Sequence, residues 1–355
     1  MRSASLVVRS VRNLTDAELV LPARGIALLG PNGHGKTNLL EALAYPVLFR
    51  SLRGARDREV ARFGGPGFHV GLVREDGLAI AVTWDAAGSR KRVTIDGADC
   101  PRITDALGHW LAVAFLPTDL ALVQGGAAER RRWLDRMLSL AHPAYLGALL
   151  RYRAAVAQRN AALRRHDGPS AVAFDGVLAA SGAAVLRHRL DWVATAGGAW
   201  REALDGLGEP LPVELRYRGA SELVETAAWE AALAAQRERD LARGQTHVGP
   251  HRDDLALGLG GHSLRRYGST GQHRTAAIGL RLLEHATLQA ARETTPALLV
   301  DDVFAELDAA RQDRLARRLG AMDAQLVVTA PREADLPDAL EVARWHVRDG
   351  TIRQG

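Results

Sequence analysis

The chain is 355 residues long, has 47% apolar residue types and carries a formal net charge of +5 at pH 7. That length suits one large domain or two smaller ones, and the apolar content is ample for a sizeable core. The sequence contains no apolar run of membrane-spanning length, and residues 1–9 lack the apolar core of a signal peptide. Cys100 is the single cysteine, which excludes an internal disulfide and a multi-cysteine zinc site. We expect a cytoplasmic protein with no membrane partner.

Residues 1–118 are expected to be rich in β-structure. Short stretches of strand-forming residues alternate with turn signals such as Asp96-Gly97. A buried strand at 24–29 and a helix beginning near Asn38 interrupt this pattern. The sequence therefore predicts an antiparallel sheet beside a strand-loop-helix unit. The expected strands of that sheet are residues 5–11, 17–21, 68–73, 79–84 and 91–95.

A phosphate-binding loop lies between that buried strand and that helix. It matches the pattern G-x-x-x-x-G-K-[ST], in which backbone N–H groups surround the phosphates and the lysine contacts the β- and γ-phosphates. Lys36 is one of only two lysines among the 46 lysine and arginine residues, so we expect it to do what an arginine fork cannot. The alternative, a glycine-rich turn with a stray lysine, fits this context poorly. The predicted ATP-binding residues are Gly30, Pro31, Asn32, Gly33, His34, Gly35, Lys36, Thr37 and Asn38, with Thr37 also a ligand of Mg²⁺ and Lys36 also catalytic.

From residue 119 the pattern changes to that of helices. Apolar residues recur at helical spacing in 129–140 and 145–165, and helical stretches follow at 171–204 and 221–243. No stretch sustains apolar heptads over many tens of residues, so a helical arm here must be short, on the order of 50 Å at about 1.5 Å per residue. We expect three segments: an ATPase head beginning at 1–118, an inserted helical lid at 119–243, and the remainder of the head at 244–355.

The first two helices of the lid are unusually basic. Residues 130–165 contain nine arginines and a single acid, Asp135. Such a stretch is typical either of a solvated helix face or of a surface that contacts nucleic acid. In the second interpretation the candidate DNA contacts are Arg151, Arg159 and Arg164, whereas Arg131 and Arg132 are alternatively anchors of the lid.

The last third of the chain supplies the acidic strand that a phosphate loop needs. Residues 296–300 read as a buried strand that runs into Asp301 and Asp302, and a further strand is expected at 325–329. Here Asp301 would hold Mg²⁺ through water, together with Thr37 and two phosphate oxygens, and Asp302 would act as the catalytic residue that orients or deprotonates the attacking water. Taken alone, Asp-Asp after a strand is common and is also compatible with a helix N-cap.

The surroundings of the acidic strand resemble the ATP-binding-cassette superfamily. A polar glycine loop at 267–272 precedes the strand and leads into a helix at 272–291, and Phe304-Ala305-Glu306-Leu307-Asp308 follows it. In that superfamily the glycine loop of one subunit closes over the γ-phosphate held by another, which implies an ATP-dependent homodimer with Ser269, Gly271 and Gln272 at the nucleotide. The implied fold class is α/β: an ATP-binding-cassette-type phosphate-loop ATPase head, with a mixed sheet and a flanking antiparallel sheet, plus an inserted helical lid.

Four stretches together resemble the RecF family of bacterial recombination mediators. They are residues 130–135, 249–255, 267–275 and 299–308, and the resemblance extends over essentially the whole chain. It implies a cytoplasmic, weak DNA-stimulated ATPase that dimerises on ATP and binds DNA at gaps where duplex meets single strand. It also implies RecR-like and RecO-like partners, assistance in loading RecA, and a place in gap repair, DNA replication and the SOS response. Arg12 lies in a segment that contacts nucleotide in this family, with a hairpin turn as the alternative role.

Three departures from related ATPases predict slow hydrolysis. Asp302 stands where a glutamate is usual, and its side chain is one methylene shorter. Residues 330–332 contain no switch histidine, and residues 115–119 contain no glutamine for the loop expected there. Two other interpretations remain open at this point: a transporter-type ATPase subunit, and a nucleotide switch that dimerises without hydrolysing ATP.

Overall fold

The computed structural model describes residues 1–355, which form two compact units. The phosphate-loop unit comprises residues 1–119, 206–208 and 284–355, and the helical unit comprises residues 120–205 and 209–283. The first boundary lies beside the predicted one, but the second does not. Residues 244–283 were expected in the ATPase head and group instead with the helical unit. The reason is that β10 (Asp254–Leu259) pairs along its whole length with β9 (Val213–Arg218), which lies inside the insert.

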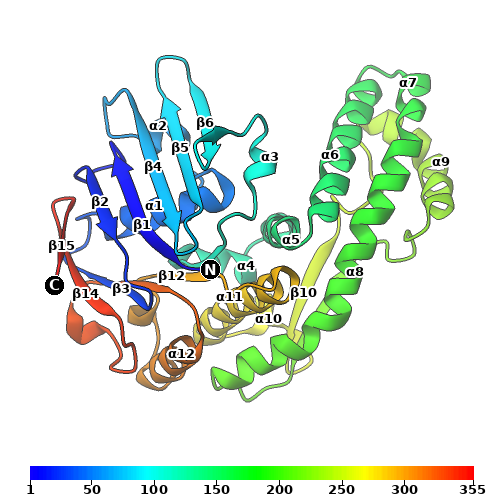
Figure 1. Cartoon of the computed structure of the whole chain (residues 1–355). Coiled ribbons are helices and arrows are strands. Elements are labelled where there is room, and N and C mark those ends of the chain that lie inside the picture. The colour runs from blue at the N-terminus through cyan, green and yellow to red at the C-terminus, as the bar shows by residue number, and fades with distance from the viewer. The chain divides into compact units, whose positions relative to one another are not determined.

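A mixed six-stranded sheet forms the base of the phosphate-loop unit (Figure 1). In spatial order its strands are β15 (Thr351–Gln354), β14 (Ala343–Arg348), β3 (Gly25–Leu29), β13 (Leu326–Ala330), β12 (Ala297–Asp301) and β8 (Ala112–Phe115). Only β15 runs antiparallel to its neighbour. Strands β3, β12 and β13 are buried along their whole length, as expected of parallel strands covered on both faces. The strands predicted at 24–29, 296–300 and 325–329 are thus confirmed.

A second, antiparallel sheet belongs to the same unit, as the sequence predicts. Its strands, in spatial order, are β2 (Ala17–Val20), β1 (Ser3–Arg9), β4 (Gly67–Arg74), β5 (Ala79–Asp85), β6 (Arg90–Ile95) and β7 (Ala98–Asp99). Helix α1 (Lys36–Leu48) packs against strands of both sheets and is buried on nearly all sides. The ring of Tyr45 on α1 meets that of Phe68 edge-on, with 5.1 Å between the ring centroids. Phe68 stacks on Trp84 with 6.1 Å between the centroids. These rings fix the antiparallel sheet over the helix that follows the phosphate loop.

Short helices and one longer helix complete the phosphate-loop unit. They are α2 (Asp57–Val60), α3 (Ile103–Ala106), α12 (Ala309–Ala321), and the 3₁₀ turns η1 (Pro117–Asp119), η2 (Phe304–Glu306) and η3 (Glu333–Asp335). Gln325, just before β13, links the late part of the chain to its beginning. Its side chain forms hydrogen bonds with the backbone of Ser3 and with the carbonyl of Pro22.

The helical unit contains the predicted helices and one small sheet. Its helices are α4 (Leu120–Gln124), α5 (Ala127–Ala141), α6 (Pro143–Arg164), α7 (Gly168–Ala173), α8 (Asp175–Gly206), α9 (Thr226–Arg243), α10 (Leu264–Tyr267) and the first half of α11 (Thr270–Arg292). The sheet has the order β11-β10-β9, where β11 is His262–Ser263. α8 spans 32 residues, so the arm is short, as predicted. No helix combines the length and the apolar character that crossing a membrane requires.

Candidate nucleotide-binding site

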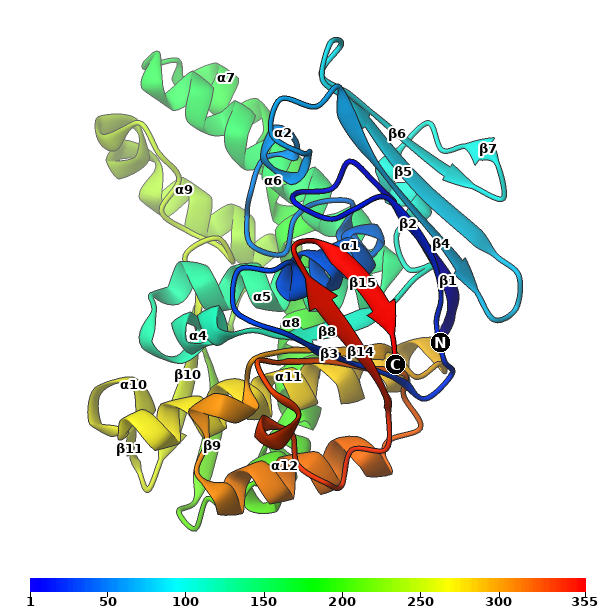
Figure 2. The same cartoon turned by 90° about the vertical axis from the view of Figure 1, so that its left-hand side faces the viewer.

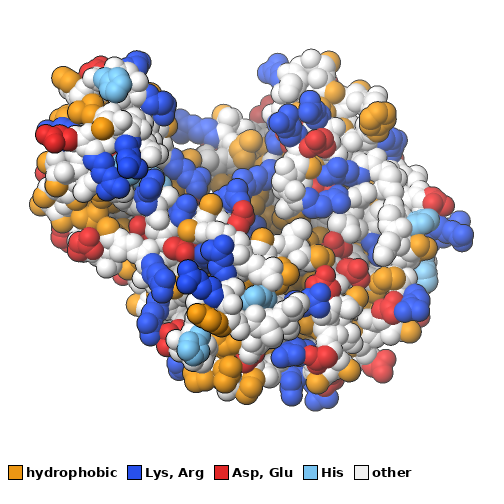
Figure 3. Space-filling view, turned by 180° about the vertical axis from the view of Figure 1, so that it is seen from behind, with side chains coloured by type: hydrophobic (Ala, Val, Ile, Leu, Met, Phe, Trp, Pro, Cys, Tyr) orange, Lys and Arg blue, Asp and Glu red, His pale blue; other side chains and the backbone are white.

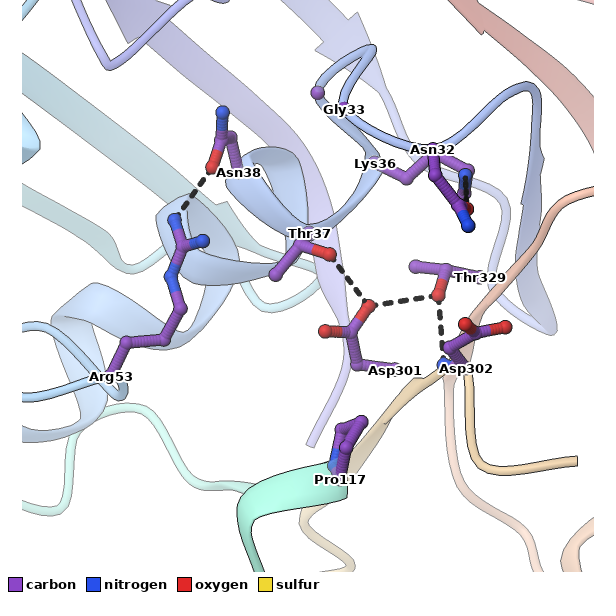
Figure 4. A pocket seen from close by; sticks show the side chains of 11 residues that line it. Asn32, Gly33, Lys36, Thr37, Asn38, Arg53, Pro117, Asp301, Asp302 and Thr329 are labelled. Atoms are coloured by element: carbon purple, nitrogen blue, oxygen red, sulfur yellow. Dashed lines mark hydrogen bonds between the residues drawn. The ribbon is translucent and has the colours of Figure 1, made fainter. Parts of the chain in front are cut away.

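Parallel strands deliver the candidate residues to one edge of the mixed sheet. β3 ends at Leu29 and runs into the phosphate loop, β12 ends at Asp301, and β13 contains Thr329. Because the carboxyl ends of parallel strands meet at the same edge, these side chains converge there. Together they line a pocket of about 440 Å³ (Figure 4). The lining residues are Asn32, Gly33, Gly35, Lys36, Thr37, Asn38, Arg53, Pro117, Asp301, Asp302 and Thr329.

The phosphate loop has the conformation of an anion cradle. Gly30, Gly33 and Gly35 adopt backbone φ values of 149°, 82° and 112°. Residues other than glycine rarely adopt such values. Helix α1 begins at Lys36, and its N-cap, Gly35, provides no side-chain cap. The first N–H groups of α1 therefore point, without a side-chain acceptor, toward the place where the motif binds phosphate.

Lys36 lies inside this cradle and is poised for a ligand. Its side chain is buried, and its Nζ donates to the carbonyl oxygens of Gly30 at 2.5 Å and Pro31 at 3.0 Å, and to Asn32 Oδ1 at 3.4 Å. None of these acceptors carries a formal charge. Burial lowers the pKa of Lys36, while the carboxylates of Asp302 and Asp301 act in the opposite direction. An anionic phosphate would relieve that desolvation.

Thr37 and Asp301 meet across the pocket although 264 positions separate them in sequence. The Thr37 hydroxyl donates to Asp301 Oδ1 at 2.9 Å, and the Thr329 hydroxyl donates to the same oxygen at 2.8 Å (Figure 4). A hydroxyl and a carboxylate oxygen are the ligand types that Mg²⁺ prefers beside phosphates. The residues present therefore fit a Mg²⁺-nucleotide, which Thr37 and Asp301 would hold.

Asp302 is held in an unusual conformation beside them. Its backbone has φ 52°, and its N–H donates to Thr329 Oγ1 at 3.0 Å. Burial raises the pKa of Asp302, and the charge of Asp301 raises it further, whereas Lys36 lowers it. A carboxyl group whose pKa is raised at a strained backbone position is typical of a functional site.

The structure adds Arg53, which was not predicted from the sequence. Arg53 Nη2 donates to Asn38 Oδ1 at 2.6 Å and pairs with the buried carboxylate of Glu41, so its guanidinium lines the pocket. No motif marks Arg53, because it lies in an irregular loop after α1. Pro117 and Thr329 were also missed, and their only signal is that each lies at or just beyond the end of a strand in the same sheet.

The predicted contact Arg12 lies close to the phosphate loop, but its guanidinium is engaged elsewhere. Its Nε and Nη2 donate to Glu41 at 3.0 and 3.2 Å. The neighbouring Asn13 is the side chain that reaches the loop, since its Nδ2 donates to the carbonyl of Gly33 at 3.3 Å.

Ser269, Gly271 and Gln272 lie in the helical unit, where they form the start of α11. The N–H of Ser269 donates to Gln272 Oε1 at 3.0 Å, and the N–H of Gln272 donates to Ser269 Oγ at 3.3 Å. This reciprocal pair is a capping-box geometry with glutamine at the third helical position. Ser269 is exposed at the helix N-terminus.

The three predicted DNA contacts on α6 are not equivalent. Arg151 and Arg164 are exposed, so both stay candidates. Arg159 is 1% exposed, and its guanidinium donates to Asp175, Asp240 and Thr246 at 2.7–2.9 Å. The structure corrects this prediction, because a buried guanidinium bound by two carboxylates cannot reach a phosphate. The prediction was wrong because Arg159 lies on the side of α6 that packs against other helices.

Two other arginines of the basic stretch also serve the fold. Arg130 is buried and binds the carboxylate of Asp254 through two nitrogens at 2.8 and 2.9 Å. Arg131 donates to the carbonyl of Asp253 at 2.6 Å, as the anchoring alternative requires, whereas Arg132 is exposed beside Glu129. Basic side chains nonetheless remain numerous on the surface of the helical unit (Figure 3).

The chain was also compared with known proteins. No family model matches the chain. A protein of Anaeromyxobacter sp. (strain Fw109-5) described as DNA replication and repair protein RecF is 37% identical over 351 residues, covering 93% of this chain and 92% of its own length. A protein of the same description from Streptomyces avermitilis is 35% identical over 375 residues and covers 100% of both chains.

Two solved structures are also similar to this chain. One of the recombination mediator protein RecF with ATP, in the RecFOR pathway, has a TM-score of 0.90 at 27% identity and covers 99% of each chain. An Smc head bound to the C-winged helix domain of ScpA has a TM-score of 0.58 at 14% identity, with 99% of this chain and 96% of that chain covered. The second likeness concerns the fold alone.

Proposed function

The chain belongs to the RecF family, and from that membership and the pocket at the sheet edge we propose that it is an ATP-dependent DNA-binding clamp of recombinational gap repair. In this proposal ATP drives two copies together on gapped or junction DNA, and slow hydrolysis releases them. The observation that carries it is the contact of Thr37 with Asp301, which joins the phosphate loop to the acidic strand beside the buried Lys36.

The residues of the pocket divide the work as follows. Lys36 and the uncapped N-terminus of α1 bind the β- and γ-phosphates, and Asn13, Asn38 and Arg53 border the same loop. When bound through Thr37 and Asp301, Mg²⁺ neutralises phosphate charge. Asp302 holds the attacking water and takes its proton. Its short side chain makes that proton transfer slow, which suits a clamp that must stay closed for a time.

The proposed dimerisation concerns Ser269, which belongs to the helical unit, and the phosphate loop, which belongs to the other unit. We propose that the Ser269 hydroxyl and the N-terminus of α11 of one copy close over the γ-phosphate bound by the other. A helix N-terminus beside a hydroxyl is an anion site without a lysine of its own. Each ATP is then shared by two chains, so ATP concentration controls assembly.

DNA and the mediator partners complete the proposal. Exposed arginines such as Arg151 and Arg164 contact the DNA backbone, which gives affinity without sequence readout. The solved relative is described as a member of the RecFOR pathway, so RecO-like and RecR-like proteins are the proposed partners. The output is assistance in loading RecA in the cytoplasm at gaps left by replication or damage.

Sedimentation with gapped DNA tests this function. The wild-type chain should sediment as a monomer without nucleotide and as a dimer with Mg²⁺-ATP, and a gapped duplex should favour the dimer more than the matching intact duplex does. The Lys36→Met variant is the control, and by itself it should remain monomeric with or without Mg²⁺-ATP and with either duplex. A wild-type chain whose mass does not respond to ATP, with or without DNA, would refute the clamp.

A further inference from the structure

The hairpin formed by β14 and β15 ends in a tight turn beside the phosphate loop. Asp349 and Gly350 form that turn, and their φ values of 49° and 77° are both left-handed, as a two-residue turn of this kind requires. β14 is the direct neighbour of β3 in the mixed sheet, so the hairpin leaves the sheet at the edge from which the phosphate loop leaves (Figure 2).

The hairpin contacts the phosphate loop at three points. The N–H of Gly350 donates to the carbonyl of His34 at 2.9 Å. Asp349 meets the imidazole of His34, whose Nδ1 lies 3.0 Å from the Asp349 N–H nitrogen and 3.0 Å from its Oδ1. A Cβ atom on Gly30 would lie 2.1 Å from the carbonyl oxygen of Val347, so β14 also abuts the start of the loop. The loop therefore rests against the hairpin along its length.

The other side of the turn is closed by the segment that joins β1 to β2. The N–H of Thr15 donates to the carbonyl of Gly350 at 2.9 Å, and a Cβ atom on Gly350 would lie 1.9 Å from the carbonyl oxygen of Asn13. Asn13 in turn donates to Gly33 of the phosphate loop. The hairpin turn is thus wedged between the phosphate loop and the segment that buttresses it.

The His34 Nδ1 atom cannot satisfy both of its Asp349 neighbours in one protonation state. An unprotonated Nδ1 accepts from the Asp349 N–H and faces the carboxylate oxygen without a proton between them. A protonated Nδ1 donates to the carboxylate in a charge-assisted hydrogen bond. Asp349 is the titratable group that faces His34 from the hairpin. The segment across the turn contributes Asn13, Leu14 and Thr15, and Lys36 turns toward Gly30 and Pro31.

We propose that Asp349 and Gly350 are positioning residues of the nucleotide site, and that the His34–Asp349 contact makes ATP affinity depend on the protonation of His34. The hairpin holds the loop in the shape that surrounds phosphate, and the protonated contact holds it more tightly. This inference rests on the proposed binding of ATP at the phosphate loop. It assigns a role in that binding to a turn more than three hundred residues away in sequence.

A matched pair of glycine substitutions tests the positioning role. Gly97 lies in a second Asp-Gly hairpin turn with φ 79°, and a Cβ atom there meets nothing within 4 Å. Gly350→Ala and Gly97→Ala therefore introduce the same backbone strain, but only Gly350→Ala places its Cβ against the carbonyl of Asn13 and so displaces the turn. We expect Gly350→Ala to weaken ATP binding about three- to tenfold, because the displaced turn disturbs its hydrogen bond to the carbonyl of His34, and Gly97→Ala to change it less than twofold. Equal effects of the two substitutions would overturn the positioning role.

A pH profile tests the protonation-dependent contact. Asp349→Asn keeps the turn, because asparagine favours its conformation, and removes only the carboxylate charge. ATP affinity of both proteins is measured between about pH 5 and pH 8. We expect the wild type to bind ATP about two- to fivefold more tightly than Asp349→Asn at the acid end, and both to bind equally at the alkaline end. The ratio cancels protonation of ATP itself.

The outcomes separate this inference from the proposed function. A ratio that is constant with pH, or that grows toward alkaline pH, would overturn the protonation-dependent contact even if ATP binds. Failure of the wild type to bind ATP at any pH would instead overturn the function. If Gly350→Ala does not fold, Asp349→Asn still tests the contact between the hairpin and His34, because its turn is intact.

Discussion

Lys36 in the phosphate-loop unit and Arg159 in the helical unit are both buried cations, with exposed fractions of 6% and 1%, yet their surroundings differ completely. Arg159 is matched by the carboxylates of Asp175 and Asp240, so its charge is consumed by the fold. Lys36 has only uncharged oxygens as acceptors, and burial lowers its pKa. The difference teaches that burial alone does not distinguish a structural cation from a functional one. The charge of the hydrogen-bond acceptors distinguishes them.

The same contrast holds for the groups around these two residues. In the helical unit, Arg189 is buried and satisfied by Asp135, Tyr145, Tyr217 and the carbonyl of Pro250. In the phosphate-loop unit, Asp302 has a raised pKa from burial and from the charge of Asp301, and α1 begins without a side-chain cap. The networks of Arg159 and Arg189 are completed within the fold, whereas the hydrogen bonds of Lys36 reach only uncharged oxygens.

Replacing Arg159 should have the largest effect, and it should act on stability. Arg159→Met leaves Asp240 and Asp175 buried without their partner, which typically costs about 3–5 kcal/mol. Urea unfolding should show that decrease in stability, while the folded fraction should bind ATP and DNA as the wild type does. A stable Arg159→Met protein with weakened DNA binding would contradict our assignment and restore Arg159 as a DNA contact.

Removing the Asp302 charge should act on chemistry instead. Asp302→Asn should lower the rate of ATP hydrolysis by about 10²-fold or more, because the proton acceptor is removed, and should leave the ATP-bound dimer intact. Asp301→Asn is its matched control, since it removes the carboxylate that we propose holds Mg²⁺ and should weaken Mg²⁺-ATP binding itself. Single-turnover hydrolysis and ATP affinity, measured separately, distinguish the two. An equal decrease of ATP affinity in both variants would refute the separate roles.

Replacing Lys36 should remove ligand binding without removing the fold. Lys36→Met cannot make charge-assisted hydrogen bonds to phosphate, and we expect ATP to bind about ten- to hundredfold more weakly. Stability should change little, since no carboxylate depends on Lys36 as Asp240 depends on Arg159. Calorimetric titration with ATP and thermal unfolding check the two halves of this prediction. Strong destabilisation with unchanged ATP affinity would make Lys36 a structural cation.

Much of this arrangement could be predicted from the sequence, and the reasons are physical. The phosphate loop and the acidic strand carry their signals locally, in glycine spacing and in a short apolar run before Asp301, so both were located. The burial of Arg159 could not be predicted, because it depends on Asp240, which lies on a helix far along the chain. Arg53 and Asp349 were missed for the same reason. Each acquires its place through long-range contacts that leave no local pattern.

Ser269 extends the comparison to the charge of the γ-phosphate, which two chains would bind together. Ser269→Arg should bind ATP as a monomer but dimerise about tenfold more weakly or worse, because a bulky side chain fills the space meant for the γ-phosphate. Mixing Ser269→Arg with Lys36→Met chains should restore one intact site and yield some mixed dimer with ATP. Sedimentation of each variant alone and of the mixture measures this. Normal ATP-dependent dimerisation of Ser269→Arg alone would eliminate the shared site.

The smallest effect is expected on the exposed side of α6, the helix that also carries Arg159. Arg151 and Arg164 are exposed there, so their charges are available to DNA phosphates where that of Arg159 is not. Replacing both with Gln should flatten the dependence of log affinity on log salt by about 0.9 for each duplex phosphate that the protein no longer neutralises.

The control for this test is an exposed arginine with a local partner. Arg317 on α12 pairs with Asp313, so Arg317→Gln should leave the salt slope unchanged. Fluorescence anisotropy of a gapped duplex at several salt concentrations gives all three slopes. A slope unaltered by the Arg151 and Arg164 substitutions would mean that these charges merely solvate the helix. The DNA surface would then lie on other arginines, and exposure would be as incomplete a guide to function as burial is.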